Sequence, residues 1–305
     1  MSPAFLGTSD FAAPVLRRLA DSPHRPELVV TPPDSRRGRG RRTASPPAAV
    51  AARELGIELL QVADVNDPAA AEAVRAADPD LAVVCAFGQL IKDPLLDEIE
   101  MLNVHPSLLP RWRGAAQIER AIMAGDRQTG VCVMRVTAGL DSGPVALCES
   151  TEIREQDSCG ELARRLAEIG GKLIVEALDR RSAGELELSE QDDPAATYAE
   201  KIEPSDRRLD PSRRAEELAA VVRALTPHIG AYIELDGGER LGVRAAHPTA
   251  ALPGLERGEL RADNGHLWLG ARDSALRLDV VQPPGGKPMP ADSYLRGHTV
   301  PARAV

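Results

Sequence analysis

The residues best suited to chemistry lie in the segment Asn103-Val104-His105-Pro106. Side chains on a β-strand repeat every two residues, so Asn103 and His105 would point to the same face. An asparagine amide can donate a hydrogen bond to a developing oxyanion, and a histidine can exchange a proton near neutral pH. The pair therefore predicts a site for acid–base chemistry, with a capping or core pair as the structural alternative.

A carboxylate that could complete this site lies in the segment Gly139-Leu140-Asp141-Ser142-Gly143-Pro144. An ordinary turn uses the same residue types, so the segment alone leaves both possibilities open. A carboxylate beside a histidine orients the imidazole and favours its protonated form. Asn103, His105 and Asp141 together suit acyl transfer through a tetrahedral intermediate. Because no serine or cysteine is obviously placed as a nucleophile, we expect direct attack by a substrate amine or by water.

Short apolar runs alternate with helical patterns before and around these residues. Leu81 to Ala86 is a continuous apolar run bounded by Pro79 and Gly88, which is typical of a central parallel strand covered on both faces. The alternation predicts an α/β fold with an open, doubly wound, Rossmann-like sheet. Asn103 and His105 would then lie at the carboxyl end of a parallel strand, where such sheets bind their ligands.

A change of pattern divides the chain. The stretch from Ser189 to Pro194 is polar and acidic, and short apolar runs separated by glycine-containing turns follow it. Such spacing is typical of a small β-barrel. We therefore expect an N-terminal domain that carries the site at residues 1–188, a linker at 189–208, and a smaller C-terminal, OB-like barrel domain at 209–305.

Composition excludes several classes of protein. With 43% hydrophobic and 27% charged residues, the chain is not disordered throughout. It has neither an apolar run near the ~20 residues that cross a bilayer nor a signal-peptide pattern, so we expect a cytoplasmic protein without membrane contact. The cysteines form no CxxC pair and are expected to be reduced, with no metal site. They are Cys85, Cys132, Cys148 and Cys159.

Five arginines crowd one short window although the net charge of the chain is −9. They are Arg36, Arg37, Arg39, Arg41 and Arg42. Unpaired charges at this density cannot be buried in a core, so they must be solvated or paired with an external polyanion. A nucleic acid is one such polyanion, and a solvated arginine-rich linker is the alternative.

The stretch from Asn103 to Ile118, together with Gly139 to Pro144, resembles the formyltetrahydrofolate-dependent formyltransferases. Further matches follow in order along the chain: Phe5 to Ala12, Pro33-Asp34 with Gly38 to Arg41, Ala86 to Ile91, Thr197 to Ile202 and Pro283 to Leu295. The resemblance is strongest to the branch that formylates the α-amino group of methionine on initiator tRNA. It implies 10-formyltetrahydrofolate as donor, no metal, and a monomeric enzyme.

Site residues also follow from the resemblance. It implies catalytic roles for Asn103, His105 and Asp141, with Asn103 and a protonated His105 stabilising the oxyanion. The residues expected to bind the folate are Phe87, Gly88, Gln89, Leu90, Ser107, Leu108, Leu109 and Pro110. The arginine window matches the family's basic insertion loop and is expected to contact the tRNA acceptor end, while the C-terminal domain is expected to bind tRNA.

Two features depart from this branch. Pro106 follows the histidine, as in the formyltransferases that act on sugar nucleotides and on glycinamide ribonucleotide, and the segment Thr226 to Gly230 has no tryptophan. The alternatives are thus a sugar-nucleotide N-formyltransferase or a formyltetrahydrofolate hydrolase. A non-catalytic RNA-binding module is a third possibility, against which the intact Asn, His and Asp set argues. The arginine window and the segment Arg111 to Ala116 oppose the sugar-nucleotide alternative.

Overall fold

A computed structural model of the chain describes residues 1–37, 42–300 and 303–304. The contacts between residues divide it into two compact units. Unit 1 comprises Met1–Gly114, Gln128–Glu152 and Ala163–Tyr198, and unit 2 comprises Ala115–Arg127, Ile153–Leu162 and Ala199–Val305. The domain boundaries expected from the sequence, 1–188, 189–208 and 209–305, stay a prediction.

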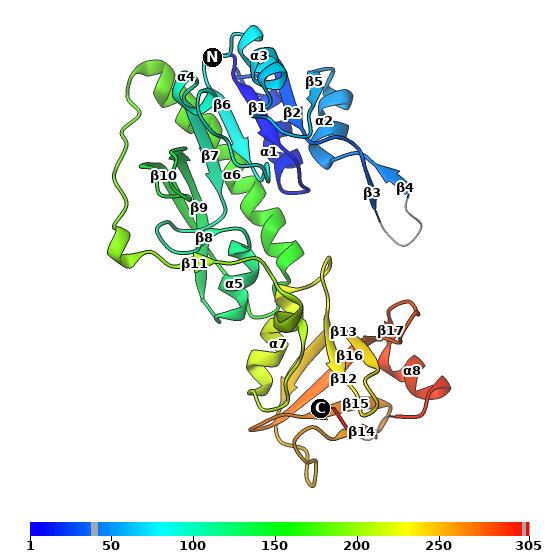
Figure 1. Cartoon of the computed structure of the whole chain (residues 1–305). Coiled ribbons are helices and arrows are strands. Elements are labelled where there is room, and N and C mark those ends of the chain that lie inside the picture. Colours follow the sequence, from blue (N-terminus) through cyan, green and yellow to red (C-terminus); the bar gives the residue numbers. More distant parts are fainter. Residues whose placement is uncertain (38–41, 301–302, 305) are drawn as a thin grey trace. The chain divides into compact units, whose positions relative to one another are not determined.

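Unit 1 is built on a seven-stranded sheet with the order β10-β9-β7-β6-β1-β2-β5 (Figure 1). The strands are β1 (Ala4–Gly7), β2 (Leu28–Thr31), β5 (Glu58–Gln61), β6 (Ala82–Cys85), β7 (Met101–His105), β9 (Gln128–Arg135) and β10 (Val145–Glu152). The first five run parallel, whereas β9 and β10 are antiparallel to their neighbours. Every residue of β1, β2 and β6 is buried, as the continuous apolar runs predicted. The prediction of a Rossmann-like sheet is confirmed.

Unit 1 also contains several helices. They are α1 (Ala12–Ala20), α2 (Pro47–Leu55), α3 (Pro68–Ala76), α4 (Leu95–Glu98) and α6 (Cys159–Ala183), which runs on from unit 2. The side chain of Asp67 caps α3 by accepting the N–H of Ala69. In α6, a Cβ on Gly170 would lie 2.7 Å from Cγ1 of Val104, so a glycine there lets the helix lie directly against β7.

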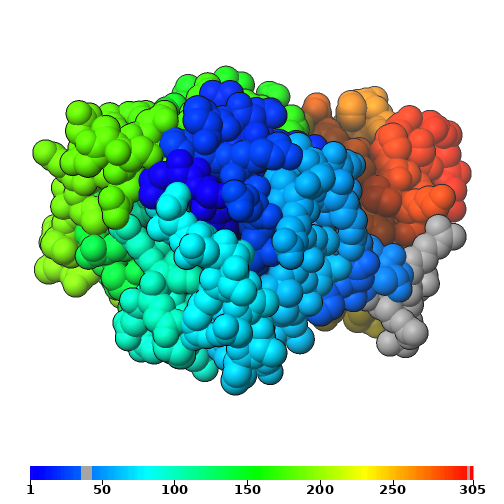
Figure 2. Space-filling view, turned by 90° about the horizontal axis from the view of Figure 1, so that it is seen from above, coloured from blue at the N-terminus to red at the C-terminus, as the bar shows by residue number. Residues whose placement is uncertain are grey.

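Shorter elements complete unit 1. β3 (Ser35–Arg37) and β4 (Arg42–Ala44) pair as a hairpin that projects from the unit (Figure 1). β8 (Arg113–Gly114) ends the first segment of unit 1, and η1 (Asp193–Ala195) follows α6. β11 (Tyr198–Ala199) spans the boundary, because Ala199 belongs to unit 2. In the space-filling view the N-terminal segments, coloured blue to cyan, form one continuous packed surface (Figure 2).

Unit 2 contains an antiparallel sheet with the order β12-β13-β16-β15-β14, and β17 pairs with β16. Its elements are α5 (Gln117–Met123), η2 (Pro204–Arg207), α7 (Ala215–Ala224), β12 (Ala231–Glu234), β13 (Arg240–Thr249), β14 (Leu260–Asp263), β15 (His266–Gly270), β16 (Ala275–Gln282), β17 (Met289–Pro290) and α8 (Ala291–Gly297). Leucines and valines of α7, β13 and β16 share one buried core. The prediction of a smaller C-terminal β domain is confirmed.

The cysteine prediction is wrong for one pair. Cys132 on β9 and Cys148 on β10 lie directly opposite each other and form a disulfide, with 4.1 Å between their Cα atoms. A cross-strand pair of this kind has no spacing signature in a sequence, because the register of the two strands creates it. Cys85 and Cys159 are free, as predicted.

No helix within the described residues has the length and apolar character needed to span a membrane.

Candidate active site

Asn103 and His105 lie at the carboxyl end of the parallel strand β7, as predicted. Strand alternation puts both on the face opposite Val104, the residue that meets α6. His105 is only 2% exposed, and Asn103 is half-buried. On β9, Met134 lies opposite Asn103 and Cys132 lies opposite His105. The two polar side chains thus lie together at the edge where doubly wound sheets generally bind their ligands.

Two oxygen atoms flank the imidazole of His105. Its Nε2 lies 3.2 Å from the carbonyl oxygen of Trp112. A carbonyl can only accept, so Nε2 carries the hydrogen and donates it. The other ring nitrogen, Nδ1, lies 3.7 Å from Oδ1 of Asp141. The neutral ring therefore keeps its lone pair on Nδ1, on the side of the carboxylate.

Burial lowers the pKa of His105, and its effect exceeds the opposing effects of the Asp141 charge and of the bond to Trp112. The resting imidazole is accordingly neutral. The charge of Asp141 favours the protonated form, as predicted, but burial of the ring outweighs it. A proton taken up at Nδ1 during a reaction would still face a carboxylate that stabilises it.

The loop that carries Asp141 joins β9 to β10, and two of its residues have unusual backbone requirements. Asp141 adopts φ +46°, a left-handed conformation that is uncommon outside glycine. Its Oδ2 accepts the N–H of Gly114 at 2.8 Å. A Cβ on Gly143 would lie 2.0 Å from the carbonyl oxygen of Arg135, so only glycine fits there. The segment is a tight turn that also brings the Asp141 carboxylate beside His105, so the two alternatives left open by the sequence are compatible.

The expected folate-binding residues after β7 form a compact loop. Ser107 is fully buried, and its hydroxyl donates to the carbonyl oxygen of Arg111 at 2.6 Å. Leu108 packs over Gly130 of β9, where a Cβ would come within 2.5 Å of Cδ2 of Leu108. Leu109 and Pro110 are half-buried. The buried Ser107 hydroxyl thus stabilises the loop itself.

The other expected folate-binding residues follow β6, the strand beside β7. Phe87 is buried, and its carbonyl oxygen accepts the hydroxyl of Thr8 at 2.6 Å. Gly88 has φ +81°, and Gln89 Oε1 accepts the N–H of Val65 at 2.8 Å. Leu90 is 66% exposed, which is unusual for a leucine and leaves it open to a ligand.

Part of the arginine window lies on β3 and β4. The backbone places Arg36 and Arg37 on β3 and Arg42 on β4, with Arg37 opposite Arg42. Arg39 and Arg41 lie outside the described residues.

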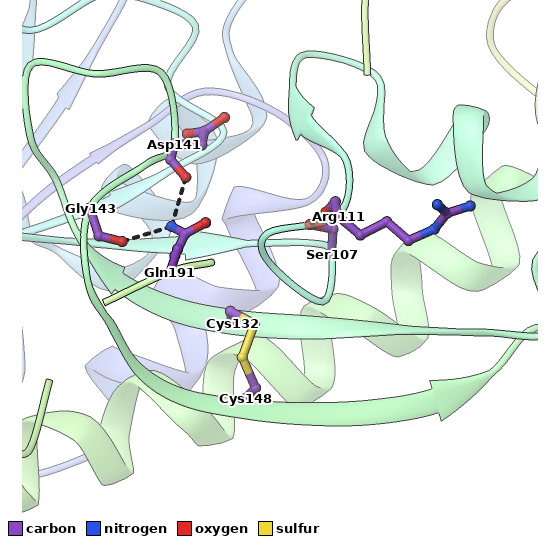
Figure 3. The surroundings of a disulfide bond; sticks show 7 residues. All are labelled: Ser107, Arg111, Cys132, Asp141, Gly143, Cys148 and Gln191. Carbon is purple, nitrogen blue, oxygen red and sulfur yellow. Dashed lines mark hydrogen bonds between the residues drawn. A yellow bond between two sulfur atoms is a disulfide. The ribbon is translucent and has the colours of Figure 1, made fainter. Parts of the chain in front are cut away.

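Three residues at the site escaped the sequence analysis. Gln191 donates its amide to the carbonyl oxygens of Asp141 at 2.9 Å and Gly143 at 2.7 Å (Figure 3). Its own oxygen accepts Nε and Nη2 of Arg113, which also pairs with Asp193 at 2.6 Å. Gln191 and Asp193 lie in the stretch expected to be a linker. A polar and acidic composition is the same in a flexible linker and in a segment that is bonded to a site, so the sequence could not distinguish the two.

The described part of the chain holds no group of three or more His, Cys, Asp or Glu side chains arranged to bind a metal ion.

Comparison with known proteins identifies both parts of the chain. The family model described as Formyl transferase matches residues 1–178, and the model Formyl transferase, C-terminal domain, matches residues 201–299. Relatives described as methionyl-tRNA formyltransferase include one from Methylococcus capsulatus, 40% identical over 99% of this chain and 98% of its own. Another, from Rubrobacter xylanophilus, is 45% identical over 98% of both chains.

Solved structures share the fold at low sequence identity. HypX from Aquifex aeolicus, in complex with tetrahydrofolic acid, has a TM-score of 0.67 at 19% identity and covers 97% of this chain and 47% of its own. The N-formyltransferase from Helicobacter canadensis also gives 0.67, at 14% identity, over 91% of this chain and 98% of its own. With both domain models matched in order and relatives at 40–45% identity over nearly its whole length, the chain belongs to the formyl transferase family.

Proposed function

We propose that the protein transfers the formyl group of 10-formyltetrahydrofolate to the α-amino group of methionine on initiator tRNA. The observation that carries this proposal is the match of 40–45% identity, through both domains, to proteins described as methionyl-tRNA formyltransferases. The sugar-nucleotide enzymes resemble this chain at identities that support a common fold only. The proposal includes a role in translation initiation, a cytoplasmic location and a monomeric state.

Asn103, His105 and Asp141 are the proposed catalytic residues. The α-amine attacks the formyl carbon, and the Asn103 amide donates to the oxygen on which negative charge develops. A new bond forms between the amine and the formyl carbon, and the bond from that carbon to N10 of the folate breaks. The amine loses one proton and N10 gains one. The lone pair on Nδ1 of neutral His105 can carry this proton while Asp141 stabilises the imidazolium.

We propose that the folate lies between the loops that follow β6 and β7. These strands are parallel neighbours, so both loops leave the same edge of the sheet. Phe87 to Leu90 would form one wall and Ser107 to Pro110 the other. The exposed side chain of Leu90 offers apolar contact, and the rigid, internally bonded loop at Ser107 offers a preformed surface.

The arginine window is the proposed tRNA contact in unit 1, and residues 209–305 are proposed to bind tRNA as well. Phosphate contacts release counterions, which makes binding depend on salt. Replacing Arg39 and Arg41 with alanine should weaken tRNA binding and flatten its salt dependence. A matched control is the double alanine variant at Arg180 and Arg181, which removes the same charge from the end of α6. Equal losses in both variants would mean that net charge, not the arginine window, attracts the tRNA.

A direct assay distinguishes the candidate functions. The protein is incubated with 10-formyltetrahydrofolate and either methionyl initiator tRNA or an amino-sugar nucleotide, and released formate is measured without an acceptor. We expect formylated methionyl-tRNA as the main product. Formylation of the sugar alone, or formate release at the same rate without an acceptor, would refute the proposal.

A further inference from the structure

We infer that Gln191, fixed by Arg113, is a positioning residue that holds the Asp141 loop against His105. This inference rests on the proposed function of Asp141. We call residues 189–197 the strap. In this inference the strap is not a free linker, because its residues hold the loops of the active site in place.

Hydrogen bonds tie both ends of the strap to loops of the site. Ser189 and Val145 exchange two backbone hydrogen bonds of 2.8 and 2.9 Å at the start of β10. At the other end, Thr197 accepts the N–H of Arg113 at 2.8 Å through its carbonyl and the N–H of Trp112 at 2.9 Å through its hydroxyl. A segment that only connected two domains would have no need of these anchors.

Gln191 uses its whole amide between these anchors. Its two N–H groups go to the carbonyl oxygens on either side of Ser142, and its oxygen accepts two N–H groups of Arg113, at 3.0 and 2.8 Å. Only a side chain with both donors and an acceptor can make this set of bonds. Glutamate at this position could still accept from Arg113 but could not donate to the loop.

Arg113 gives the arrangement a fixed base. It is 3% exposed, and Asp193, 74% exposed at its side chain, pairs with the same guanidinium. The two neighbours of Arg113 hold the proposed catalytic pair directly. The carbonyl of Trp112 accepts from His105, and the N–H of Gly114 donates to the carboxylate of Asp141. Three consecutive residues therefore determine where the imidazole, the carboxylate and the loop backbone lie.

The loop needs such support because Asp141 has a left-handed backbone conformation. This conformation costs free energy for any residue other than glycine, although less for aspartate, and hydrogen bonds from the surroundings help to maintain it. In the structure, Oδ1 of Asp141 lies 3.7 Å from Nδ1 of His105. Without the Gln191 donors, the loop can relax and the carboxylate can move away from the imidazole. A small misplacement of a catalytic group lowers the rate of the chemical step more than it lowers substrate binding.

The test is Gln191→Glu, which keeps the size and the acceptor but removes both donors. We expect kcat for formyl transfer to fall by about 10- to 100-fold, with KM for folate and tRNA nearly unchanged. Because the effect passes through Asp141, the double variant Q191E/D141N should be no slower than D141N alone. The pH dependence of kcat should shift in the same direction in Q191E and in D141N.

Gln61→Glu is a matched control in unit 1. There the Gln61 amide donates to the carbonyl oxygen of Pro32 at 3.1 Å, and its oxygen accepts Nη2 of Arg53 at 2.9 Å. This control should leave kcat unchanged at saturating substrates. If Q191E is unfolded, Asp193→Asn removes the exposed partner of Arg113 instead, and a smaller fall in kcat without a change in KM is expected.

Normal kcat in folded Q191E, or losses that multiply in the double variant, would overturn the inference. The proposed function is tested separately by the wild-type product. NMR titration of the His105 ring needs no turnover, so it reports on positioning even if the acceptor is not tRNA. An unchanged His105 titration in Q191E would also count against the inference.

Discussion

Replacing Asp141 with asparagine removes the charge beside His105 while keeping the shape of the loop. Asparagine tolerates the left-handed backbone that Asp141 adopts, and its side-chain oxygen can still accept the N–H of Gly114. Alanine would lose both features. The asparagine variant therefore isolates the contribution of the charge to the proposed proton transfer.

The size of the effect follows from the separation of 3.7 Å between Nδ1 and Oδ1. At this distance, two unit charges interact with about 4.5 kcal/mol at an effective dielectric constant of about 20 and about 1 kcal/mol in bulk water. The side chain of Asp141 is 19% exposed and that of His105 is buried, so the interaction lies between these limits. About 3 kcal/mol of lost imidazolium stabilisation corresponds to roughly 100-fold in kcat.

The assay is steady-state formylation of methionyl initiator tRNA, with tetrahydrofolate affinity measured in parallel. We expect D141N to lose roughly 100-fold in kcat and to bind the folate almost normally. Asp179→Asn is the matched control, because it breaks another His–Asp pair of unit 1, in which His24 Nε2 lies 2.8 Å from Asp179. The control should keep its activity. Near-normal turnover of D141N would remove Asp141 from the mechanism.

Three further predictions concern stability and titration. Gly130→Ala should lower the free energy of unfolding by about 1–3 kcal/mol, since its Cβ would lie 2.2 Å from a backbone carbonyl of β10. Gly297→Ala, whose Cβ would meet no atom within 4 Å, should not destabilise the protein. Thermal unfolding measures both variants. Thiol titration of the denatured, unreduced protein should detect two of the four cysteines. Reduction of the Cys132–Cys148 disulfide, which closes a loop with a sequence separation of 16, should lower the free energy of unfolding by about 3 kcal/mol. Four reactive thiols before reduction would contradict the disulfide. The pKa of His105 in the folded state lies below its ordinary 6.5, so the unfolded chain binds more protons between these two values. The contribution of neutral His105 to stability is therefore complete above pH 6.5. It is lost as the pH falls towards the folded-state pKa. His105→Gln should flatten this part of the stability curve, and an unchanged curve would contradict the burial argument.

Patterns local in the sequence were enough to predict the scaffold. A buried parallel strand needs a continuous run of apolar residues, which identified β6, and the two-residue repeat of a strand put Asn103 and His105 on one face. The glycine-rich segment around Asp141 was recognisable as a turn because its backbone geometry restricts the residue types allowed there. These features depend on neighbours within a few positions, so the sequence records them directly.

The tertiary structure decided which distant residues meet. The disulfide depends on the register of β9 and β10. The ionic state of His105 depends on how deeply the edge of the sheet is buried. The strap depends on hydrogen bonds from Gln191 to residues 48 and 50 positions earlier in the chain. The residue type of a hydrogen-bond donor, a carboxylate or a thiol does not indicate which distant residue it will pair with. Their pairing is set by packing of the whole sheet, and for this reason a stretch that looks like a linker is anchored to the loops of the candidate site.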